Sequence, residues 1–330
     1  DLGTTVDEEA FWKKLQDSVL NLQSELSMDK EKCYVDPKVK EDSKTLKKTL
    51  AKMKTLKDVK ITYTFGDKQE VLDGTEICKW MKFEEGKAVV DDEQALAYVK
   101  SLGSKYNTVY KPKTLKTSWG STVTISNGSY GWKIGNDKEL EQLKKDIDAG
   151  KDVTRDPVYA QTANSHGEND YGDTYVEINL TAQHLYFYKN GNLVVDSDFV
   201  SGNISKGNGT PVGAYPVTYT ERNATLKGEN YSSDVSFWMP YCGNVGMHDA
   251  SWRSTFGGNI YKRNGSHGCV NLPYAAAKTI FENIAAGYPV LVYELPGTES
   301  PKAIAMDQGA SVVDAINGIG EVSLGSEGAI

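Results

Sequence analysis

The residues with the clearest chemistry form one short run, 266–271, which reads Ser-His-Gly-Cys-Val-Asn. Pro273 follows it at a position typical of the first turn of a helix, so we expect Cys269 just before a helix N-terminus. The partial positive charge there lowers the pKa of a thiol and raises its thiolate fraction. Gly268 allows close backbone approach, so N–H groups beside Cys269 are expected to face a developing oxyanion. The run predicts a cysteine nucleophile for acyl transfer.

Such a nucleophile needs a base that takes its proton and later returns one to the leaving amine. His267 is two residues from Cys269 and would share its side-chain direction in an extended backbone. His248 is distant in sequence, but it lies in Gly-Met-His-Asp at the end of a β-patterned stretch, where a strand can bring it beside the thiol. The other two histidines are expected outside the site, His184 on an alternating strand and His166 in a solvated loop.

Aromatic and cationic residues near His248 are candidates for a substrate groove. Arg253 can bind a substrate carboxylate through two parallel hydrogen bonds, or it can form a surface salt bridge. Aromatic residues in such a stretch fill a core as often as a pocket, so both interpretations stay open. The candidates besides Arg253 are Trp252, Tyr219, Trp238, Met239 and Tyr241.

The remaining cysteines, Cys33, Cys78 and Cys242, are expected to be small buried hydrophobic residues. Cys242 lies close to His248 in sequence, so an approach to the pocket is the alternative for it. A disulfide between Cys33 and Cys78 would fit an oxidising environment. The sequence holds no Cys-x-x-Cys pair and no other plausible ligand set, so no metal site is predicted.

A chain of 330 residues has room for two domains of ordinary size. Its net charge of -8 argues against nucleic-acid binding, which usually needs a basic patch. It holds no apolar stretch of about 18 residues, so we expect no membrane span. The sequence opens without a signal-peptide pattern, and we expect any export signal or anchor to lie outside it.

The first half has the pattern of an α+β module. Residues 1–30 are expected to hold an N-terminal helix, with Thr5 and Glu8 at capping-box spacing. Residues 31–152 are expected to form one domain, including a helix that starts at Asp91 and ends at Gly103. Between residues 36 and 60, nine lysines stand against four acidic residues, which indicates a solvated helix face or contact with an anionic wall polymer.

The second half, residues 153–297, has the pattern of a mainly β domain. Alternating strands begin at Thr174, and Asn190-Gly191 is a strong hairpin signal. One main helix is expected over 273–286, followed by a buried strand over 289–293. The segment 298–330 is expected to be an acidic tail.

The spacing of the chemical residues resembles that of L,D-transpeptidases of the YkuD type. These carry a His, usually followed by Gly, then about sixteen residues, then Ser/Thr-His-Gly-Cys, a hydrophobic residue and Asn. Here His248 and Asp249 are followed by residues 250–265 and then by the run 266–271. The resemblance implies a YkuD-type β-sandwich with Cys269 as the nucleophile and His248 as the base. It also implies that Ser266, His267, Gly268, Asn271 and, in place of the usual Gly, Asp249 shape the site.

The upstream sequence is similar to the peptidoglycan-binding domain that precedes many Gram-positive L,D-transpeptidases. The similarity lies in Thr-Val-Thr-Ile at 122–125 and in the stretch 128–134, which is followed by a helix with an acidic start. The tail resembles the opening of small helical repeats of Firmicutes surface proteins. The similarity places the protein outside the cell and associated with the wall.

The resemblance implies formation of 3-3 peptidoglycan cross-links through a thioacyl-enzyme. The partners would be a donor tetrapeptide stem and an amine acceptor, a carbapenem would acylate the same thiol, and no metal or organic cofactor would be needed. Two alternatives stay open. An L,D-carboxypeptidase would use water as the acceptor, and a non-catalytic wall-binding protein would not need the Cys-His pair.

Overall fold

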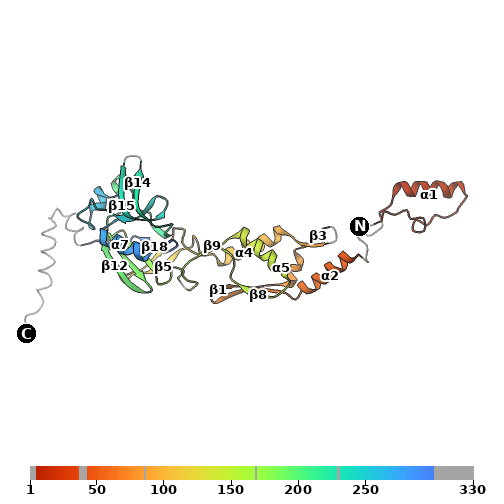
Figure 1. Cartoon of the computed structure of the whole chain (residues 1–330), viewed down its shortest axis with the longest axis horizontal. Helices are drawn as coiled ribbons and strands as arrows, with labels where there is room; N and C mark the ends of the chain where they lie inside the picture. The colour runs from red at the N-terminus through yellow and green to blue at the C-terminus, as the bar shows by residue number, and fades with distance from the viewer. Residues whose placement is uncertain (1–4, 37–42, 85–86, 168, 229–230, 301–330) are drawn as a thin grey trace, which may run out of the picture. The chain divides into compact units, whose positions relative to one another are not determined.

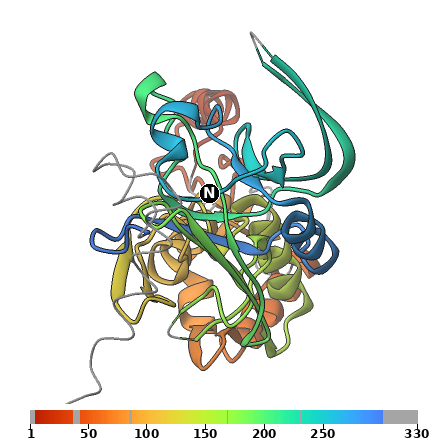
Figure 2. The same cartoon turned by 90° about the vertical axis from the view of Figure 1, so that its left-hand side faces the viewer.

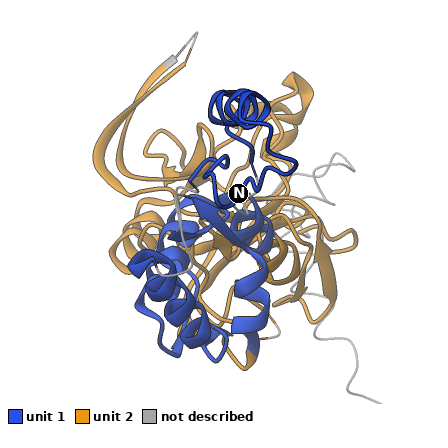
Figure 3. Ribbon diagram, turned by 90° about the vertical axis from the view of Figure 1, so that its right-hand side faces the viewer, with its two compact units in different colours: residues 1–64, 69–100, 136–157 blue, residues 65–68, 101–135, 158–330 orange. Residues whose placement is uncertain are grey.

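The protein is described here from a computed structural model, which covers residues 5–36, 43–84, 87–167, 169–228 and 231–300 (Figure 1). The chain divides into two compact units (Figure 3). Unit 1 comprises residues 1–64, 69–100 and 136–157, and unit 2 comprises residues 65–68, 101–135 and 158–330. The units are interleaved along the chain, whereas the sequence analysis expected consecutive domains, and the boundaries at 30, 152 and 297 stay a prediction.

The N-terminal segment holds helix α1 (Glu8–Leu20). Its N-cap is Asp7, whose carboxylate accepts a hydrogen bond from the Ala10 N–H at 2.9 Å. The predicted capping box on Thr5 is therefore wrong, because Asp7 supplies the oxygen that satisfies the first turn. Val6 pairs with Tyr34 in an antiparallel bridge that closes the segment back on itself.

The rest of unit 1 is a mixed α/β body. Its three-stranded sheet has the order β2-β1-β8, with β1 parallel to β8. Glu139 is fully buried, and the Arg155 guanidinium binds both its carboxylate oxygens at 2.7 and 3.0 Å. Tyr63 donates a third hydrogen bond to Glu139, at 2.7 Å. The elements of this part of the chain are α2 (Lys44–Leu56), β1 (Lys60–Phe65), β2 (Lys68–Asp73), α3 (Gly74–Lys79), β3 (Met81–Glu84), β4 (Lys87–Val90), α4 (Asp92–Tyr106), α5 (Asn136–Ala149) and β8 (Val153–Arg155).

Helix α4 runs past Gly103, where the sequence analysis expected it to end. The Asn107 N–H still bonds to the Gly103 carbonyl in helical fashion at 2.9 Å. A glycine weakens a helix interior by about 1 kcal/mol but does not stop it. Asn107 follows the last residue of the helix, and its side-chain oxygen accepts a hydrogen bond from the Ile134 N–H at 2.8 Å.

Unit 2 is built on two sheets with a shared core, and Figure 2 shows it with the β14–β15 hairpin projecting from the body. The five-stranded sheet has the order β12-β11-β10-β18-β13 and the four-stranded sheet the order β14-β15-β16-β17. One apolar cluster joins them, with Ile178 and Phe187 from the first sheet and Met239, Met247 and Val270 from the second. The larger strands are β10 (Tyr175–Asn179), β11 (His184–Lys189), β12 (Asn192–Asp198), β13 (Gly213–Pro216), β14 (Glu221–Gly228), β15 (Tyr231–Cys242), β16 (Val245–Asp249), β17 (Val270–Leu272) and β18 (Pro289–Tyr293).

Unit 2 also holds two short helices near β16 and β17. Helix α7 (Tyr274–Asn283) packs against this core through Ala277 and Ile280, and Pro273 is its N-cap. Helix α6 (Ile260–Asn264) lies in the connection between β16 and β17. The predictions of a mixed first half and a mainly β second half are confirmed. The predicted Asn190-Gly191 turn is also confirmed, because both residues have positive φ between β11 and β12.

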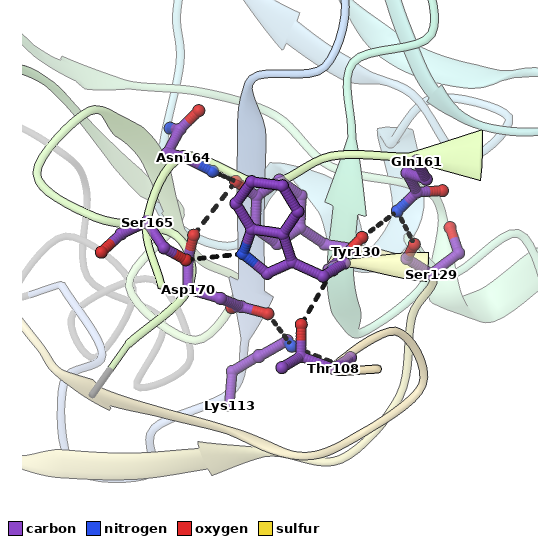
Figure 4. A network of polar contacts seen from close by, with 10 residues as sticks. Thr108, Lys113, Ser129, Tyr130, Gln161, Asn164, Ser165 and Asp170 are labelled. Carbon is purple, nitrogen blue, oxygen red and sulfur yellow. Dashed lines mark hydrogen bonds and ion pairs between the residues drawn. The ribbon is translucent and has the colours of Figure 1, made fainter. Parts of the chain in front are cut away.

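Residues 101–135 and 158–172 complete unit 2 with β5 (Lys113–Lys116), β6 (Thr122–Ile125), β7 (Lys133–Ile134) and β9 (Tyr159–Gln161). A buried ion pair joins the Lys113 ammonium to Asp170 at 2.5 Å, and Lys113 also donates to the Thr108 carbonyl at 2.7 Å (Figure 4). Tyr130 links this pair to Asn164, whose N–H donates to its hydroxyl at 2.8 Å. These contacts join residues 101–135 to residues 158–172. The predicted acidic tail from residue 301 onward lies outside the described residues.

Candidate active site

The site begins with two adjacent parallel strands, β16 and β17. Their register pairs Met247 with Val270 and His248 with Asn271. Met247 and Val270 are fully buried in the shared core, so alternation turns the side chains on either side of them to the opposite face. Cys269 directly precedes β17 and therefore faces the same side as His248. The strand pairing brings together two residues that are far apart in sequence.

The imidazole of His248 is held by a main-chain contact. Its Nδ1 lies 2.8 Å from the carbonyl oxygen of Asp249. A carbonyl oxygen can only accept, so Nδ1 carries the proton and Nε2 has the free lone pair. Burial lowers the pKa of His248, although the hydrogen bond to Asp249 opposes this effect. The ring is thus a neutral imidazole with its basic nitrogen fixed.

The side chain of Asp249 has a structural partner. Its Oδ1 accepts hydrogen bonds from the main-chain N–H groups of Ser236 and Phe237 at 2.8 and 2.9 Å. Asp249 is buried, and it satisfies one buried and one partly buried donor of β15. Asp249 therefore supplies its carbonyl oxygen to His248 and its carboxylate to the neighbouring strand.

Cys269 does not lie at a helix N-terminus, which corrects the sequence-based expectation. Strand β17 intervenes, and helix α7 begins only at Tyr274. The thiol is 8% exposed, and burial raises its pKa, while a hydrogen bond from the Gly246 main chain acts in the opposite direction. Its sulfur lies 3.6 Å from the Asn244 carbonyl oxygen, to which the thiol donates. Burial and the contact with the Asn244 carbonyl both favour the protonated form of the thiol.

The turn that presents Cys269 is closed by Ser266. Its hydroxyl donates to the Cys269 carbonyl at 2.5 Å and accepts from the Gly268 N–H at 3.0 Å. Gly268 adopts φ +125°, a conformation that L side chains rarely adopt. Its N–H is held by Ser266, so the expected oxyanion contact does not come from this group. Ser266 and Gly268 instead fix the backbone on which the thiol sits.

Cys269 and His248 line one cavity of about 170 Å³. Two of the lining residues each have a buried polar atom without a hydrogen-bond partner in the described part of the chain, Oδ1 of Asn271 and Nε of Arg253. The remaining lining residues come from the β14–β15 hairpin and from the chain between β16 and Cys269, and they are Leu226, Ser233, Trp252, Gly265, Ser266 and His267. The cavity thus combines a thiol, an oriented imidazole and unsatisfied polar groups, which suits capture of a polar peptide and attack on one of its carbonyl groups.

Comparison with known proteins identifies the family of this chain. Residues 173–292 match the L,D-transpeptidase catalytic domain family, and residues 42–155 match a family described as a peptidoglycan binding domain. The L,D-transpeptidase Ldtfm, solved as its avibactam carbamoyl enzyme, is 39% identical, with 75% of this chain and 98% of that chain covered and a TM-score of 0.60. The chain belongs to the L,D-transpeptidase family.

A second solved relative has the same extent. The Enterococcus faecium L,D-transpeptidase, solved as a cysteine-to-serine mutant, is 37% identical, with 74% of this chain and 100% of that chain covered and a TM-score of 0.59. No curated protein sequence matches the chain. The protein is therefore a cysteine-dependent acyltransferase of peptidoglycan, and its upstream part corresponds to the peptidoglycan binding family.

The groove candidates of this L,D-transpeptidase separate into two groups. Trp252 and Arg253 line the cavity, and the Trp252 ring centroid lies 5.9 Å from that of His248. Trp238 is buried beside the reacting pair, because it pairs with His248 across the sheet and packs in one cluster with Cys269. Its ring centroid lies 5.9 Å from that of His248, and its Nε1 donates to the Tyr219 hydroxyl. Tyr241 and Met239 belong to the core. Sequence reasoning missed Leu226 and Ser233, because they reach the cavity only through the pairing of β14 with β15.

The remaining cysteines and histidines of the L,D-transpeptidase lie away from the cavity lining. All four cysteines are free, so Cys33 and Cys78 do not pair. His166 stacks on Trp132 with ring centroids 3.7 Å apart, which corrects its expected place in a solvated loop. Among the described residues, no cluster of three or more His, Cys, Asp or Glu side chains could hold a metal ion. None of the helices in this described part is both long and apolar enough to span a membrane.

Proposed function

We propose that this L,D-transpeptidase forms 3-3 peptidoglycan cross-links with Cys269 as the nucleophile and His248 as the general base. The observation that carries the proposal is the shared cavity, in which the thiol faces the same side as an imidazole whose tautomer is set by Asp249. A wall-binding module would need no such pair.

The first half of the reaction acylates the thiol. His248 Nε2 takes the proton of the Cys269 thiol, and the sulfur attacks the carbonyl carbon of the third stem residue. The amide bond to the terminal D-alanine then breaks, and its nitrogen takes the proton from His248. D-Alanine leaves as a free amino acid, and a thioester joins Cys269 to the shortened donor stem.

The second half resolves the thioester. The amine of the third residue of a neighbouring stem, or of its side branch, attacks the thioester carbonyl while His248 takes a proton from it. The carbon–sulfur bond breaks, the sulfur recovers the proton, and a new amide joins the two stems. The proton inventory balances over the cycle, and these steps need no metal ion or organic cofactor.

The electrostatic setting favours transfer at the moment of attack. Burial raises the pKa of Cys269 and lowers that of His248, so both groups rest in their neutral forms. Asn271 lines the cavity and its Oδ1 has no hydrogen-bond partner among the described residues, which supports a role for it in accepting an N–H of the donor backbone.

Product analysis tests the function. The purified protein is mixed with disaccharide tetrapeptide, and the products are identified by mass spectrometry. We expect a dimer that has lost one D-alanine, no product with Cys269→Ala, and a rate about 100-fold or more lower with His248→Ala. Tripeptide monomer alone would establish the L,D-carboxypeptidase. Absence of both products and of a thioester would contradict the proposal and favour a wall-binding protein.

Covalent inhibition provides an independent test. A relative forms a carbamoyl enzyme with avibactam, and we extend this reaction, and acylation by carbapenems, to Cys269. Intact mass should show one adduct per chain that disappears in Cys269→Ala. An adduct that persists in this variant would place the reactive group elsewhere.

We also propose that the protein works outside the cytoplasmic membrane, with residues 42–155 contacting the wall polymer. The exposed lysines 44, 47 and 48 of α2 are candidates for this contact. Sedimentation with purified sacculi should fall in the triple Lys→Gln variant and should also fall with salt in the wild type. Unchanged sedimentation would leave these lysines as a solvated helix face.

A further inference from the structure

We propose that Arg253 binds the terminal carboxylate of the donor stem, the carboxylate of the D-amino acid that leaves, and thereby selects stems that end in a free acid. The proposal rests on the proposed function, because it assumes attack by Cys269 and proton donation by His248. Arg253 acts as a specificity-determining residue that touches the substrate and takes no proton.

The position of Arg253 between two cavities is the first observation. It lines the small cavity that holds Cys269 and His248, and it also lines an adjoining cavity of about 680 Å³. Its main-chain N–H donates to the Ala250 carbonyl in the turn after β16, at 3.0 Å. This turn fixes the residue just beyond the end of the strand that carries His248.

The guanidinium of Arg253 lacks the partner that such a group normally has. Its Nε is buried without a hydrogen-bond partner, and no ion pair joins Arg253 to a carboxylate within the residues described. A half-buried guanidinium without an anion is costly, because the desolvation of the charge is not compensated. The fork geometry of its donors matches a carboxylate, which can accept two parallel hydrogen bonds.

The charge of the outer cavity supports an anionic ligand. Its lining includes Lys262 and Arg263 in addition to Arg253, and no acidic side chain is among the lining residues. The lining of the inner cavity has no acidic side chain either. An anion entering from this side meets a consistently positive wall, and the protein provides no competing carboxylate in either lining.

The chemistry of the leaving group places its carboxylate near Arg253. The nitrogen of the leaving D-alanine has to reach His248 to receive a proton, and its carboxylate is attached to the very next carbon. The positive charge of Arg253 acts on His248 directly, since it contributes to lowering the pKa of this residue. Arg253 is the cation that lines the same cavity as this imidazole, so it can bind that carboxylate.

Arg253 could also bind the carboxylate of an acceptor whose amine and carboxylate share one carbon, because that amine gives its proton to the same imidazole, His248. We assign the donor, because every donor tetrapeptide carries this carboxylate whatever acceptor is used. The two sources are separated by measuring donor acylation and acceptor attack individually.

The experiment compares the tetrapeptide acid with its C-terminal amide as donors, in the wild type and in Arg253→Gln. Release of D-alanine or D-alaninamide is followed under single-turnover conditions. The wild type should prefer the acid by roughly 10- to 100-fold in the second-order rate constant, and the variant should lose this preference by slowing on the acid alone. Arg253→Lys should restore part of the preference. Equal preference in wild type and Arg253→Gln would overturn the proposal.

Controls separate this outcome from other failures. Arg263→Gln, an exposed arginine that lines only the outer cavity, should keep the wild-type preference, and its loss there would indicate a general charge effect instead of a contact by Arg253. Alkylation of Cys269 by neutral iodoacetamide should be equal in wild type and Arg253→Gln, which shows an intact site. If the wild type itself releases no D-alanine, the proposed function has failed and not the role of Arg253.

The acceptor arm uses a preformed thioester and compares D-alanine with D-alaninamide as the attacking amine. The assignment to the donor requires that Arg253→Gln changes the acid-to-amide ratio for the donor step. A change confined to the acceptor arm would overturn the donor assignment and move the carboxylate to the incoming amine.

Discussion

The Nδ1 of His248 lies 2.8 Å from the main-chain oxygen of the next residue, Asp249. The orienting group for the proposed base is thus part of the backbone, and it does not depend on the side chain at position 249. This separates the orientation of the imidazole from the packing role of the Asp249 carboxylate, and the two can be tested apart.

Replacement of Asp249 by Ala should cost stability more than catalysis. The variant leaves the buried N–H groups of Ser236 and Phe237 without acceptors, at about 1–3 kcal/mol each. The rate per folded molecule should fall less than tenfold, roughly 1.4 kcal/mol, because the carbonyl remains. Chemical denaturation and single-turnover acylation measure the two effects. Asp249→Asn keeps an acceptor oxygen and should lose less stability; equal losses in both variants would contradict this account.

The pH dependence of acylation should show a broad plateau. The pKa of His248 is lowered from 6.5, so the acid limb, where the base becomes protonated, should lie below that pH. The pKa of Cys269 is raised from 9.0, so thiol ionisation should begin to matter only above it. The pH profile of the second-order acylation rate constant measures both limbs. An acid limb above pH 6.5 would instead indicate a resting thiolate–imidazolium pair.

His184 should make stability depend on pH. Burial disfavours its charged form, but hydrogen bonds to Asp198 and Asp196 outweigh burial and raise its pKa above 6.5. A raised folded-state pKa gives a contribution that is complete below the unfolded pKa and is lost as the pH rises through the folded pKa. The denaturation midpoint of the wild type minus that of His184→Gln should therefore shrink from pH 5.5 to pH 9. A constant difference across this range would rule out the linkage.

Loss of Arg155 should destabilise unit 1 strongly. Arg155→Ala leaves the fully buried Glu139 without its cation, which typically costs about 3–5 kcal/mol. Lys52→Ala is the matched control, since the Lys52–Asp148 pair is exposed and such pairs contribute about 1 kcal/mol or less. Urea unfolding followed by far-UV circular dichroism measures both. Similar losses in the two variants would mean that burial of Glu139 does not matter.

The sequence predicted the type of enzyme, but it did not predict the secondary structure around Cys269. The spacing from His248 to Cys269 could be recognised because the proposed base lies on β16 and the proposed nucleophile directly precedes the neighbouring parallel strand β17. The local setting of Cys269 was mispredicted, because strand β17 occupies the residues between it and α7. Such a three-residue strand has too little periodicity to be seen in a sequence.

Residues brought in by tertiary pairing were not predictable. Leu226 reaches the cavity through the β14–β15 hairpin, and no local pattern distinguishes it from other residues of that strand. Tyr241 is an aromatic residue close in sequence to His248, as a groove residue would be, yet it lies on β15 with its side chain in the core. The unpaired state of Arg253 likewise depends on which carboxylates the fold leaves nearby.

The parallel direction of β16 and β17 obliges the chain to travel back before the second strand can start, and residues 250–265 make that return. The same return path supplies the whole lining of the outer cavity. The proposed reacting pair and the proposed carboxylate-binding Arg253 therefore lie in one uninterrupted stretch, residues 248–271. Residues 250–265 could therefore be exchanged as a unit, because the sheet holds both ends of this segment. Such an exchange offers a direct way to redirect the enzyme to other substrates while His248 and Cys269 keep their positions.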